Sequence, residues 1–282
     1  MQTPGLDKLA IKLPIYPITL LPLSMQELVN SGYTALHYDT LLFKGAYPRL
    51  YDKNLEPHEW YPDYIQTYIE RDVRQLKNVH DLAVFHRFVK LCAGRIGQIL
   101  NLSSLANDCG ITHNTAKSWI GLLESSFIIL LLRPYYGNFG KQLIKSPKIY
   151  FYDLGVACSL LDVTTEQQLK SHYLRGGLFE NFIIMELVKA HFNRGLQPQL
   201  FFWRDKHGHE IDCLLKKDNK LLPIEIKSGQ TITSDFFNGL KYWQELTGLA
   251  TQQSSLIYGG LQTQKRTQAA VYSWRDFVQQ LI

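Results

Sequence analysis

The sequence predicts a chain of the α/β (α+β) class, helical in its first part and built on a central mixed sheet in its second. Helical patterns follow one another from residue 55 to residue 125. Three strand-like segments then succeed each other between residues 200 and 227, and a helix, a strand and a final helix complete the chain.

Length and composition favour a folded protein of about two domains. The 282 residues are 45% apolar and 12% aromatic, which excludes disordered and collagen-like chains. The net charge is +5, and residues 81–145 hold seven Lys or Arg against three Asp or Glu. This mild basic excess permits an anionic partner without requiring one.

The sequence carries no mark of secretion or of a membrane. The four cysteines form no CxxC pair, which argues for a reducing compartment and against a disulfide framework or a zinc ribbon. The longest apolar run, Phe127–Leu132, is far shorter than the ~20 residues of a membrane-spanning helix. The start lacks the features of a signal peptide, so we expect a cytoplasmic protein with no membrane partner.

The region before residue 81 is expected to hold no complete domain. Prolines at 14, 17 and 22 restrict the first stretch to extended conformations until a helix begins near Ser24, a suitable N-cap. We interpret residues 1–35 as the end of a domain whose beginning is missing. Residues 36–80 are interpreted as a helical, lid-like segment, because residues 55–80 have a helical pattern.

Residues 81–153 are predicted to form a winged helix-turn-helix. The first helix, over 82–93, has a single apolar stripe. Two apolar strands, 127–132 and 148–152, would form the wing through the loop YYGNFGKQ. Between the first helix and these strands, small and apolar residues have the spacing of two crossing helices with a glycine turn, namely Ala106, Gly110, Ala116 and Trp119.

The second helix of this motif is a candidate DNA reader. Thr112 would cap it and leave four polar side chains facing outward, those of His113, Asn114, Lys117 and Ser118. Such side chains suit contacts with base edges or phosphates. One alternative is a helix-turn-helix that only packs against a protein partner. Another is a transcriptional repressor that binds a palindromic site as a two-fold dimer.

Residues 154–282 are predicted to form the α/β domain. Its helix over 176–192 is apolar around most of its circumference, so Glu180 on it is costly unless another group neutralises it. The strands that follow are expected over 200–203, 210–215 and 221–227. On the second strand, alternation places three apolar side chains on one face, those of Ile211, Cys213 and Leu215.

Two carboxylates and an ammonium are expected together on one face of this sheet. Asp212 lies opposite the apolar face of its strand, and Glu225 and Lys227 share a face of the next strand. Two adjacent carboxylates repel unless a divalent cation lies between them, and oxygen ligands suit Mg²⁺ or Mn²⁺. Lys227 would orient or help deprotonate a water, and Glu180 would reach the same face. The alternative is a half-buried salt-bridge cluster without chemistry.

The strings HEIDCLL (209–215) and PIEIKSG (223–229), with Glu180 before them, resemble the PD-(D/E)xK, or restriction-endonuclease-like, superfamily. From about residue 14 onward the chain also resembles the C-terminal part of a prokaryotic family of AAA-type ATPases. In that family a winged helix and a nuclease-like domain of unknown function follow the ATPase. The strings that carry this resemblance are LLPLSMQEL, FKGAYPRL, YIERDV, KIYFYDLG, GLFENFI and FFWRDKHGHEIDCLL.

The resemblance implies that Asp212 and Glu225 are metal ligands, that Glu180 is an accessory ligand and that Lys227 is the water-orienting base. It also implies that residues 1–35 end an ATPase domain and that residues 154–282 form a restriction-endonuclease-like domain. The sequence has no G-x-x-x-x-G-K-[ST] string, so we expect no nucleotide cofactor and no ATPase activity from this chain alone.

The expected function is that of a DNA-binding protein with a Mg²⁺- or Mn²⁺-dependent nuclease-like domain that hydrolyses phosphodiesters. An ATPase on a separate chain is the expected partner, and a homo-oligomer stays open. The alternative is a non-enzymatic DNA-binding or assembly module, or a transcriptional regulator, that keeps only the fold.

Overall fold

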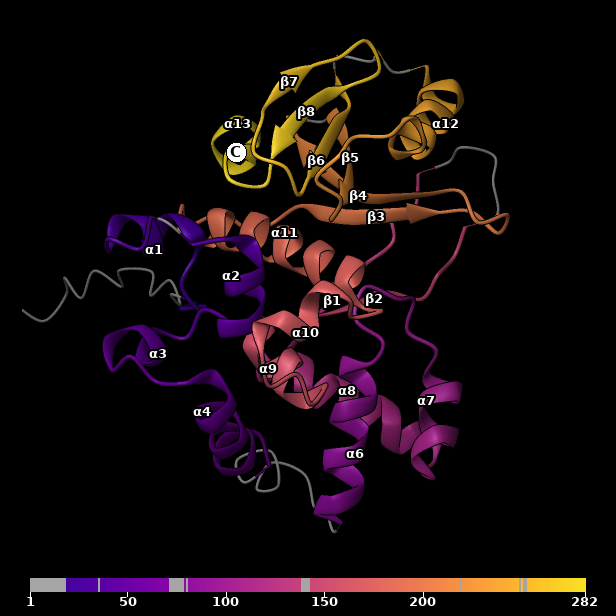
Figure 1. The fold of residues 1–282 in the computed structure, drawn as a ribbon. Coiled ribbons are helices and arrows are strands. Elements are labelled where there is room, and N and C mark those ends of the chain that lie inside the picture. Colours follow the sequence, from indigo (N-terminus) through magenta and orange to yellow (C-terminus); the bar gives the residue numbers. More distant parts are fainter. Residues whose placement is uncertain are drawn as a thin grey trace, which may run out of the picture.

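The computed structural model describes residues 19–34, 36–70, 79, 81–137, 143–218, 220–248, 250 and 253–282. Short N-terminal helices lie beside a helical unit that ends in a small antiparallel sheet, and a larger mixed sheet lies next to both (Figure 1). One apolar core extends through these parts from Leu28 to Leu281. No helix within the described residues has the length and apolar character to cross a membrane.

The described N-terminal region is a run of short helices. Ser24 Oγ accepts from the Glu27 backbone N–H at 3.3 Å, and Glu27 Oε2 accepts from Ser24 N at 2.7 Å. This capping box confirms the predicted helix start near Ser24. The prolines at 14 and 17 and residues 71–78 and 80 lie outside the described part of the chain. The helices are α1 (Met25–Asn30), α2 (Tyr38–Lys44), α3 (Pro48–Asp52), α4 (Pro57–Tyr64) and the π-helix η1 (Ile65–Glu70).

The next unit, called here the α6–β2 unit, has the predicted order of helices followed by two strands. Thr112 Oγ1 accepts from Thr115 N at 3.1 Å and caps α8, as the sequence predicts. Gly110 ends α7 in the left-handed conformation with φ of 72°, which glycine adopts without strain. The elements are α6 (Leu82–Ala93), α7 (Leu102–Cys109), α8 (His113–Ser125), β1 (Ile129–Leu132) and β2 (Lys148–Phe151).

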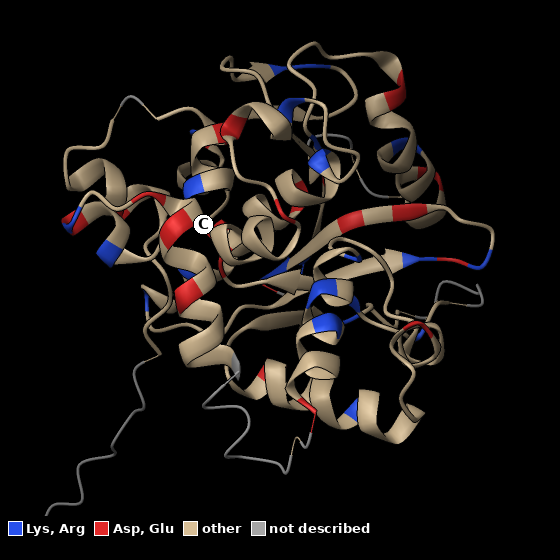
Figure 2. Ribbon diagram, turned by 60° about the horizontal axis from the view of Figure 1, so that its bottom comes forward, with Lys and Arg blue, Asp and Glu red and all other residues tan. Residues whose placement is uncertain are grey.

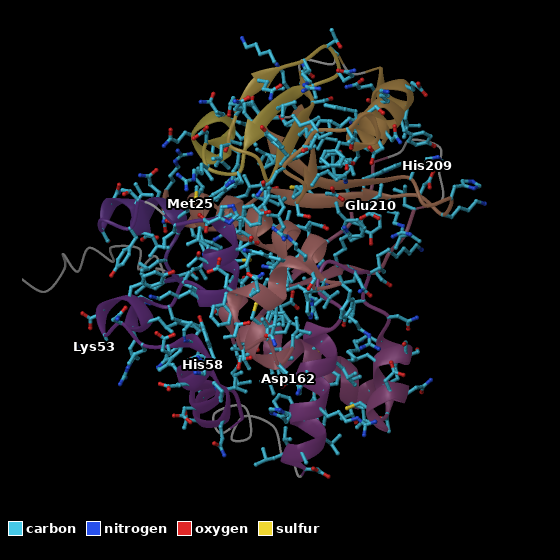
Figure 3. All side chains as sticks on the ribbon, in the orientation of Figure 1. Met25, Lys53, His58, Asp162, His209 and Glu210 are labelled. Carbon is cyan, nitrogen blue, oxygen red and sulfur yellow. The ribbon has the colours of Figure 1, made fainter. Side chains whose placement is uncertain are left out.

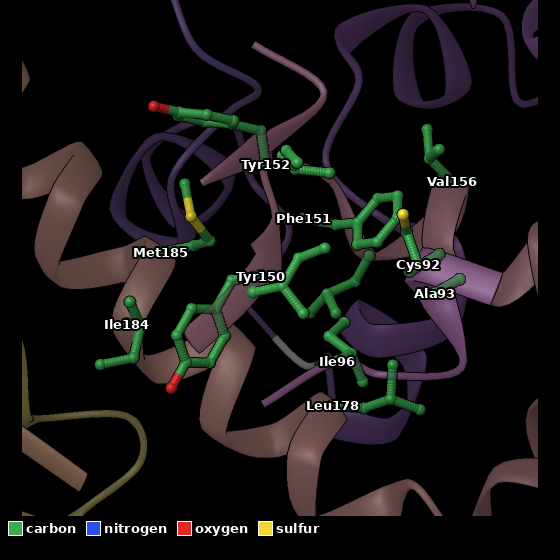
Figure 4. Close-up of a cluster of buried hydrophobic side chains, with 14 of the residues drawn as sticks. Cys92, Ala93, Ile96, Tyr150, Phe151, Tyr152, Val156, Leu178, Ile184 and Met185 are labelled. Carbon is green, nitrogen blue, oxygen red and sulfur yellow. The ribbon is translucent and has the colours of Figure 1, made fainter. Parts of the chain in front are cut away.

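Strand β2 joins the α6–β2 unit to the helix α11 (Arg175–Phe192). Around β2, apolar side chains from the end of α6 and from α11 form one cluster (Figure 4). Within it, the fully buried Asn181 of α11 accepts from Phe151 N at 2.6 Å and donates to Phe151 O at 2.9 Å. A side-chain amide thus completes the backbone pairing of β2, which fixes the strand against α11.

The described residues on either side of positions 138–142, between β1 and β2, pair with the larger sheet. Phe202 N donates to Arg133 O at 3.1 Å, and Tyr135 N donates to Phe202 O at 2.7 Å. On the returning side, Ile144 N donates to Arg204 O at 3.1 Å. The flanks of the predicted wing therefore extend the edge of the larger sheet, whereas residues 138–142 at its tip lie outside the described part.

Among the described residues, six strands form one sheet in the order β3-β4-β5-β6-β8-β7. The β3–β4, β4–β5 and β7–β8 pairs are antiparallel, whereas β5–β6 and β6–β8 are parallel. The predicted mixed sheet is therefore confirmed. Its strands are β3 (Leu200–Arg204), β4 (Glu210–Lys217), β5 (Lys220–Lys227), β6 (Ser255–Tyr258), β7 (Gln264–Lys265) and β8 (Ala270–Ser273).

Helices cover both faces of this sheet. Ile224 and Ile226 of β5 belong to the core cluster that contains α11, whereas Leu214 and Leu256 belong to a second cluster with α12 (Asn238–Thr247). Figure 1 shows α11 and α12 on opposite sides of the strands. The remaining elements are α9 (Leu154–Leu160), α10 (Glu166–Lys170), the 3₁₀ helix η2 (Ser234–Phe237) and α13 (Phe277–Leu281).

The prediction that Ile211, Cys213 and Leu215 share one face of β4 is wrong. Ile211 packs in the cluster with α12, whereas Cys213 and Leu215 pack in the cluster with α11. Phe201 pairs with Leu214 and Trp203 pairs with Ile211, so two steps along β3 match three steps along β4. This bulge adds a residue to β4 beside Asp212 and reverses the alternation there.

Candidate functional site

An open cleft of about 810 Å³ lies between the α6–β2 unit and the larger sheet. Residues 97–99, which follow α6, and Lys148 of β2 form one wall. The opposite wall comes from β3, β4, β5 and α12. Figure 2 shows that charged residues of both signs are interleaved along the helices and strands.

The four residues predicted as catalytic, Glu180, Asp212, Glu225 and Lys227, all line this cleft. Cys213 pairs with Ile224 in the antiparallel β4–β5 ladder, which brings the preceding Asp212 beside Glu225. Lys227 Nζ donates to Glu225 Oε2 at 2.6 Å and to Asp212 Oδ2 at 3.2 Å. The two carboxylates and the ammonium are therefore in direct contact.

Backbone geometry holds the two carboxylates at the bottom of the cleft. Ile226 N donates to Asp212 Oδ2 at 2.8 Å, so Asp212 is tied to β5 at the position of the β4 bulge. Glu225 is only 4% exposed and lies against α12. A Cβ atom at Gly239 of α12 would overlap Glu225 Oε1, so a glycine is required for the helix to approach the strand this closely.

The surroundings of the two carboxylates shift their pKa values in opposite directions. Burial raises the pKa of Glu225 well above its usual value, and the charge of Asp212 raises it further, while Lys227 opposes both effects. Burial also acts to raise the pKa of Asp212, but the ammonium groups of Lys227 and Lys148 outweigh it, so that pKa is lowered. The pKa of Lys227 is raised, because its two carboxylates outweigh its burial. The pKa values of the two carboxylates are therefore shifted in opposite directions, down for Asp212 and up for Glu225.

Glu180 lies in the same cleft but has other partners. Its Oε1 atom accepts from Lys148 Nζ at 2.8 Å and from Tyr150 Oη at 2.6 Å. Burial and the charge of Asp212 raise its pKa, while Lys148 lowers it. A lysine of β2 therefore offsets the charge of Glu180, whose role as a metal ligand stays a prediction.

Four residues of this network were not found by sequence reasoning: Lys148, Tyr150, Arg204 and Glu210. Lys148 Nζ also forms an ion pair with Glu210 Oε1, and Arg204 Nη1 donates to Glu210 Oε2 at 2.9 Å. A signal was available in the string KIYFYDLG, where Lys148 and Tyr150 alternate on a strand otherwise made of apolar residues.

A second polar group lies on the wall formed by the β3–β4 turn. His209 Nδ1 is 3.0 Å from Asp205 Oδ2, and the His209 ring stacks on Tyr242 at 3.7 Å between centroids. His209 and Glu210 lie together at this turn (Figure 3). The Asp205 carboxylate therefore fixes the orientation of an imidazole that lines the cleft.

The residues predicted to contact DNA lie on α8, and none of them is among the residues that line the cleft. His113, Asn114 and Lys117 are exposed, and Ser118 is partly buried. Their outward orientation agrees with the sequence analysis. Contact with DNA stays a prediction.

The donor set provides two carboxylates for a metal ion. Among the described residues, no three Asp, Glu, His or Cys side chains are grouped so that they could hold a metal. Asp212 and Glu225 alone are a set of the kind that suits Mg²⁺ or Mn²⁺, because Mg²⁺ keeps several waters and needs only one or two carboxylates.

Comparisons with known proteins give two family matches and no established activity. The family described as "Domain of unknown function (DUF8612)" matches residues 35–167. The family described as "Domain of unknown function (DUF4143)" matches residues 175–277, which include Glu180, Asp212, Glu225 and Lys227. Lys148 lies in the first match, so the cleft has residues from both.

Two curated relatives are the uncharacterized proteins Mb2031c of Mycobacterium bovis and Rv2008c of Mycobacterium tuberculosis. Each is 26% identical to this chain over 225 residues. The match covers 79% of this chain and 49% of each relative, so the chain spans about half the length of the curated relatives it matches. No solved structure matches.

Proposed function

We propose that this chain binds DNA through the α6–β2 unit and hydrolyses phosphodiester bonds in the cleft with the help of Mg²⁺ or Mn²⁺. The observation that carries the proposal is the direct contact of Asp212, Glu225 and Lys227 in an open cleft. A buried pair of carboxylates without a function is costly, so this arrangement favours a catalytic role.

In this proposal each side chain has a separate role. Asp212 and Glu225 would hold the divalent cation through their carboxylate oxygens, which must be ionised to act as ligands. The cation would supply positive charge next to a phosphodiester in the cleft. Lys227 stays an ammonium, because two carboxylates raise its pKa, so it orients the attacking water by donating a hydrogen bond.

The finer points of fold and partner belong to the same proposal. We assign the segment over 154–282 to the restriction-endonuclease-like fold, supported by the mixed sheet between α11 and α12. We also propose that residues 81–153 form a winged helix-turn-helix, and the order of helices and strands in the α6–β2 unit supports this assignment. Three further parts of the proposal rest on the sequence analysis alone. They are a partner ATPase on a separate chain, the origin of residues 1–35 as the end of an ATPase domain, and a cytoplasmic location.

A plasmid-nicking assay with Mg²⁺ or Mn²⁺ tests the proposal. The wild type is expected to convert supercoiled plasmid to the nicked form only when the metal is present, and Asp212→Asn is expected to lose this activity. The matched control is Asp153→Asn, because Asp153 is also a buried carboxylate but lies outside the cleft. Nicking that survives in Asp212→Asn at matched purity would assign the cut to a contaminant or to another site.

One observation favours the non-enzymatic alternative. Lys227 already contacts both carboxylates, so the cluster is neutralised in part without any metal. If the wild type binds DNA but nicks no plasmid with either metal, the chain acts as a DNA-binding or assembly module that keeps the fold. Binding is measured by fluorescence anisotropy of a labelled duplex.

A further inference from the structure

Lys148 is a buried lysine of the α6–β2 unit that contacts two carboxylates of the following segment, which contains α11 and the larger sheet. It lies on β2, its side chain is 3% exposed, and its Nζ atom contacts Glu180 at 2.8 Å and Glu210. Both carboxylates belong to the segment with α11 and β4, beyond the first family match. No function assigned above to the cleft uses Lys148.

The position of Lys148 is fixed from several sides. Ile149 donates its N–H to Gln98 O at 3.1 Å and accepts from Gly97 N at 2.8 Å, so the wall of the cleft pairs with β2. Asn181 holds Phe151 on the other side, as described above. Lys148 therefore stays where it is unless β2 leaves α11.

This lysine is the charge partner of Glu180, the residue that the resemblance names as an accessory metal ligand. Glu180 Oε1 accepts from both Lys148 and Tyr150, and the same lysine balances Glu210. Glu180 and Asp212 line the same cleft, and the charge of Asp212 acts to raise the pKa of Glu180. Without Lys148, Glu180 would be a buried carboxylate next to Asp212 with a strong need for a cation.

We propose that Lys148 is a positioning residue that holds Glu180 and Glu210 away from the metal, so that the cation is bound by Asp212 and Glu225 alone. This inference rests on the proposed metal site. It replaces the accessory-ligand role that the resemblance gives to Glu180. Lys148 thereby makes the α6–β2 unit a structural part of the active site.

The test is a titration of the full chain with Mn²⁺ alone. Binding is measured by isothermal titration calorimetry and by the loss of the electron paramagnetic resonance signal of free Mn²⁺. Lys148→Met should raise the Mn²⁺ affinity about tenfold, at the lower end of the effect of groups next to a metal. The double variant Lys148→Met/Glu180→Gln should return to the wild-type affinity. Glu180→Gln alone should bind Mn²⁺ like the wild type.

Lys189→Met is the matched control, because Lys189 is a buried lysine of α11 that pairs with Glu186 at 3.1 Å outside the cleft. It should leave the Mn²⁺ affinity unchanged, so a gain in this variant too would overturn the proposal. Glu180→Gln keeps the proposal testable if Lys148→Met does not fold: a tenfold loss of affinity in this variant would show that Glu180 is already a ligand.

The failure of the proposed function gives a different pattern. If the wild type binds no Mn²⁺, the metal site at Asp212 and Glu225 is wrong. A Glu180-dependent gain of binding in Lys148→Met would still support the role of Lys148 in occupying Glu180. An unchanged affinity in a folded Lys148→Met overturns that role.

Discussion

Asn181→Ala is the most direct test of how the α6–β2 unit is attached to the rest of the protein. The side chain is fully buried, and it pairs with both the N–H and the C=O of Phe151. The variant leaves these two backbone groups buried without a partner. Each costs about 1–3 kcal/mol, so the free energy of unfolding should fall by about 2–6 kcal/mol.

Urea denaturation followed by tryptophan fluorescence measures this loss. Asn114→Ala is the control, because Asn114 is exposed on α8 and its removal should change the stability by less than about 0.5 kcal/mol. A loss below about 1 kcal/mol in Asn181→Ala would refute the reasoning, since it would mean that water or a shifted backbone satisfies Phe151.

Three further predictions concern the site, the DNA contact and pH. Gly239→Ala should displace the buried carboxylate of Glu225 and weaken Mn²⁺ binding in calorimetry, whereas Gly121→Ala, in open space on α8, should not. Lys117→Ala should weaken DNA binding and flatten its salt dependence by about one unit of slope, whereas the exposed Lys170→Ala should change neither. Burial acts to raise the pKa of Asp205, but hydrogen bonds from His209 and from nearby backbone N–H groups outweigh it and lower that pKa. Asp205 therefore contributes stability that is fully present above the ordinary pKa of an aspartate in the unfolded chain and is lost as the pH falls through the lower folded value. Asp205→Asn should thus lower the melting temperature at neutral pH and make little difference in strong acid, below both pKa values.

Local signals in the sequence predict the elements well. The capping residues Ser24 and Thr112 lie where their helices begin, because a cap needs only a side chain and the next three residues. The antiparallel meander likewise brings Asp212 to Glu225 through strand pairing alone. Both inferences depend on residues that are near in the chain or on adjacent strands.

The features that the sequence does not reveal depend on distant contacts. The bulge beside Asp212 arises from the pairing of β4 with β3, so simple alternation misplaces Ile211. One flank of the predicted wing, at Arg133 and Tyr135, pairs with Phe202, about 70 residues along the chain, a contact that no local pattern indicates. Lys148 similarly finds Glu210 only in the folded chain.

These distant contacts have a common consequence for the site. The carboxylates lie in the segment of the second family match, whereas the buried lysine that balances Glu180 and Glu210 lies in the segment of the first. Separating the two segments would expose the wall of the cleft and leave Glu180 without its cation. The cleft is therefore a property of the interface between the two segments, and β2 ties the helices of the α6–β2 unit to this cleft through its contacts with Glu180 and Asn181 of α11.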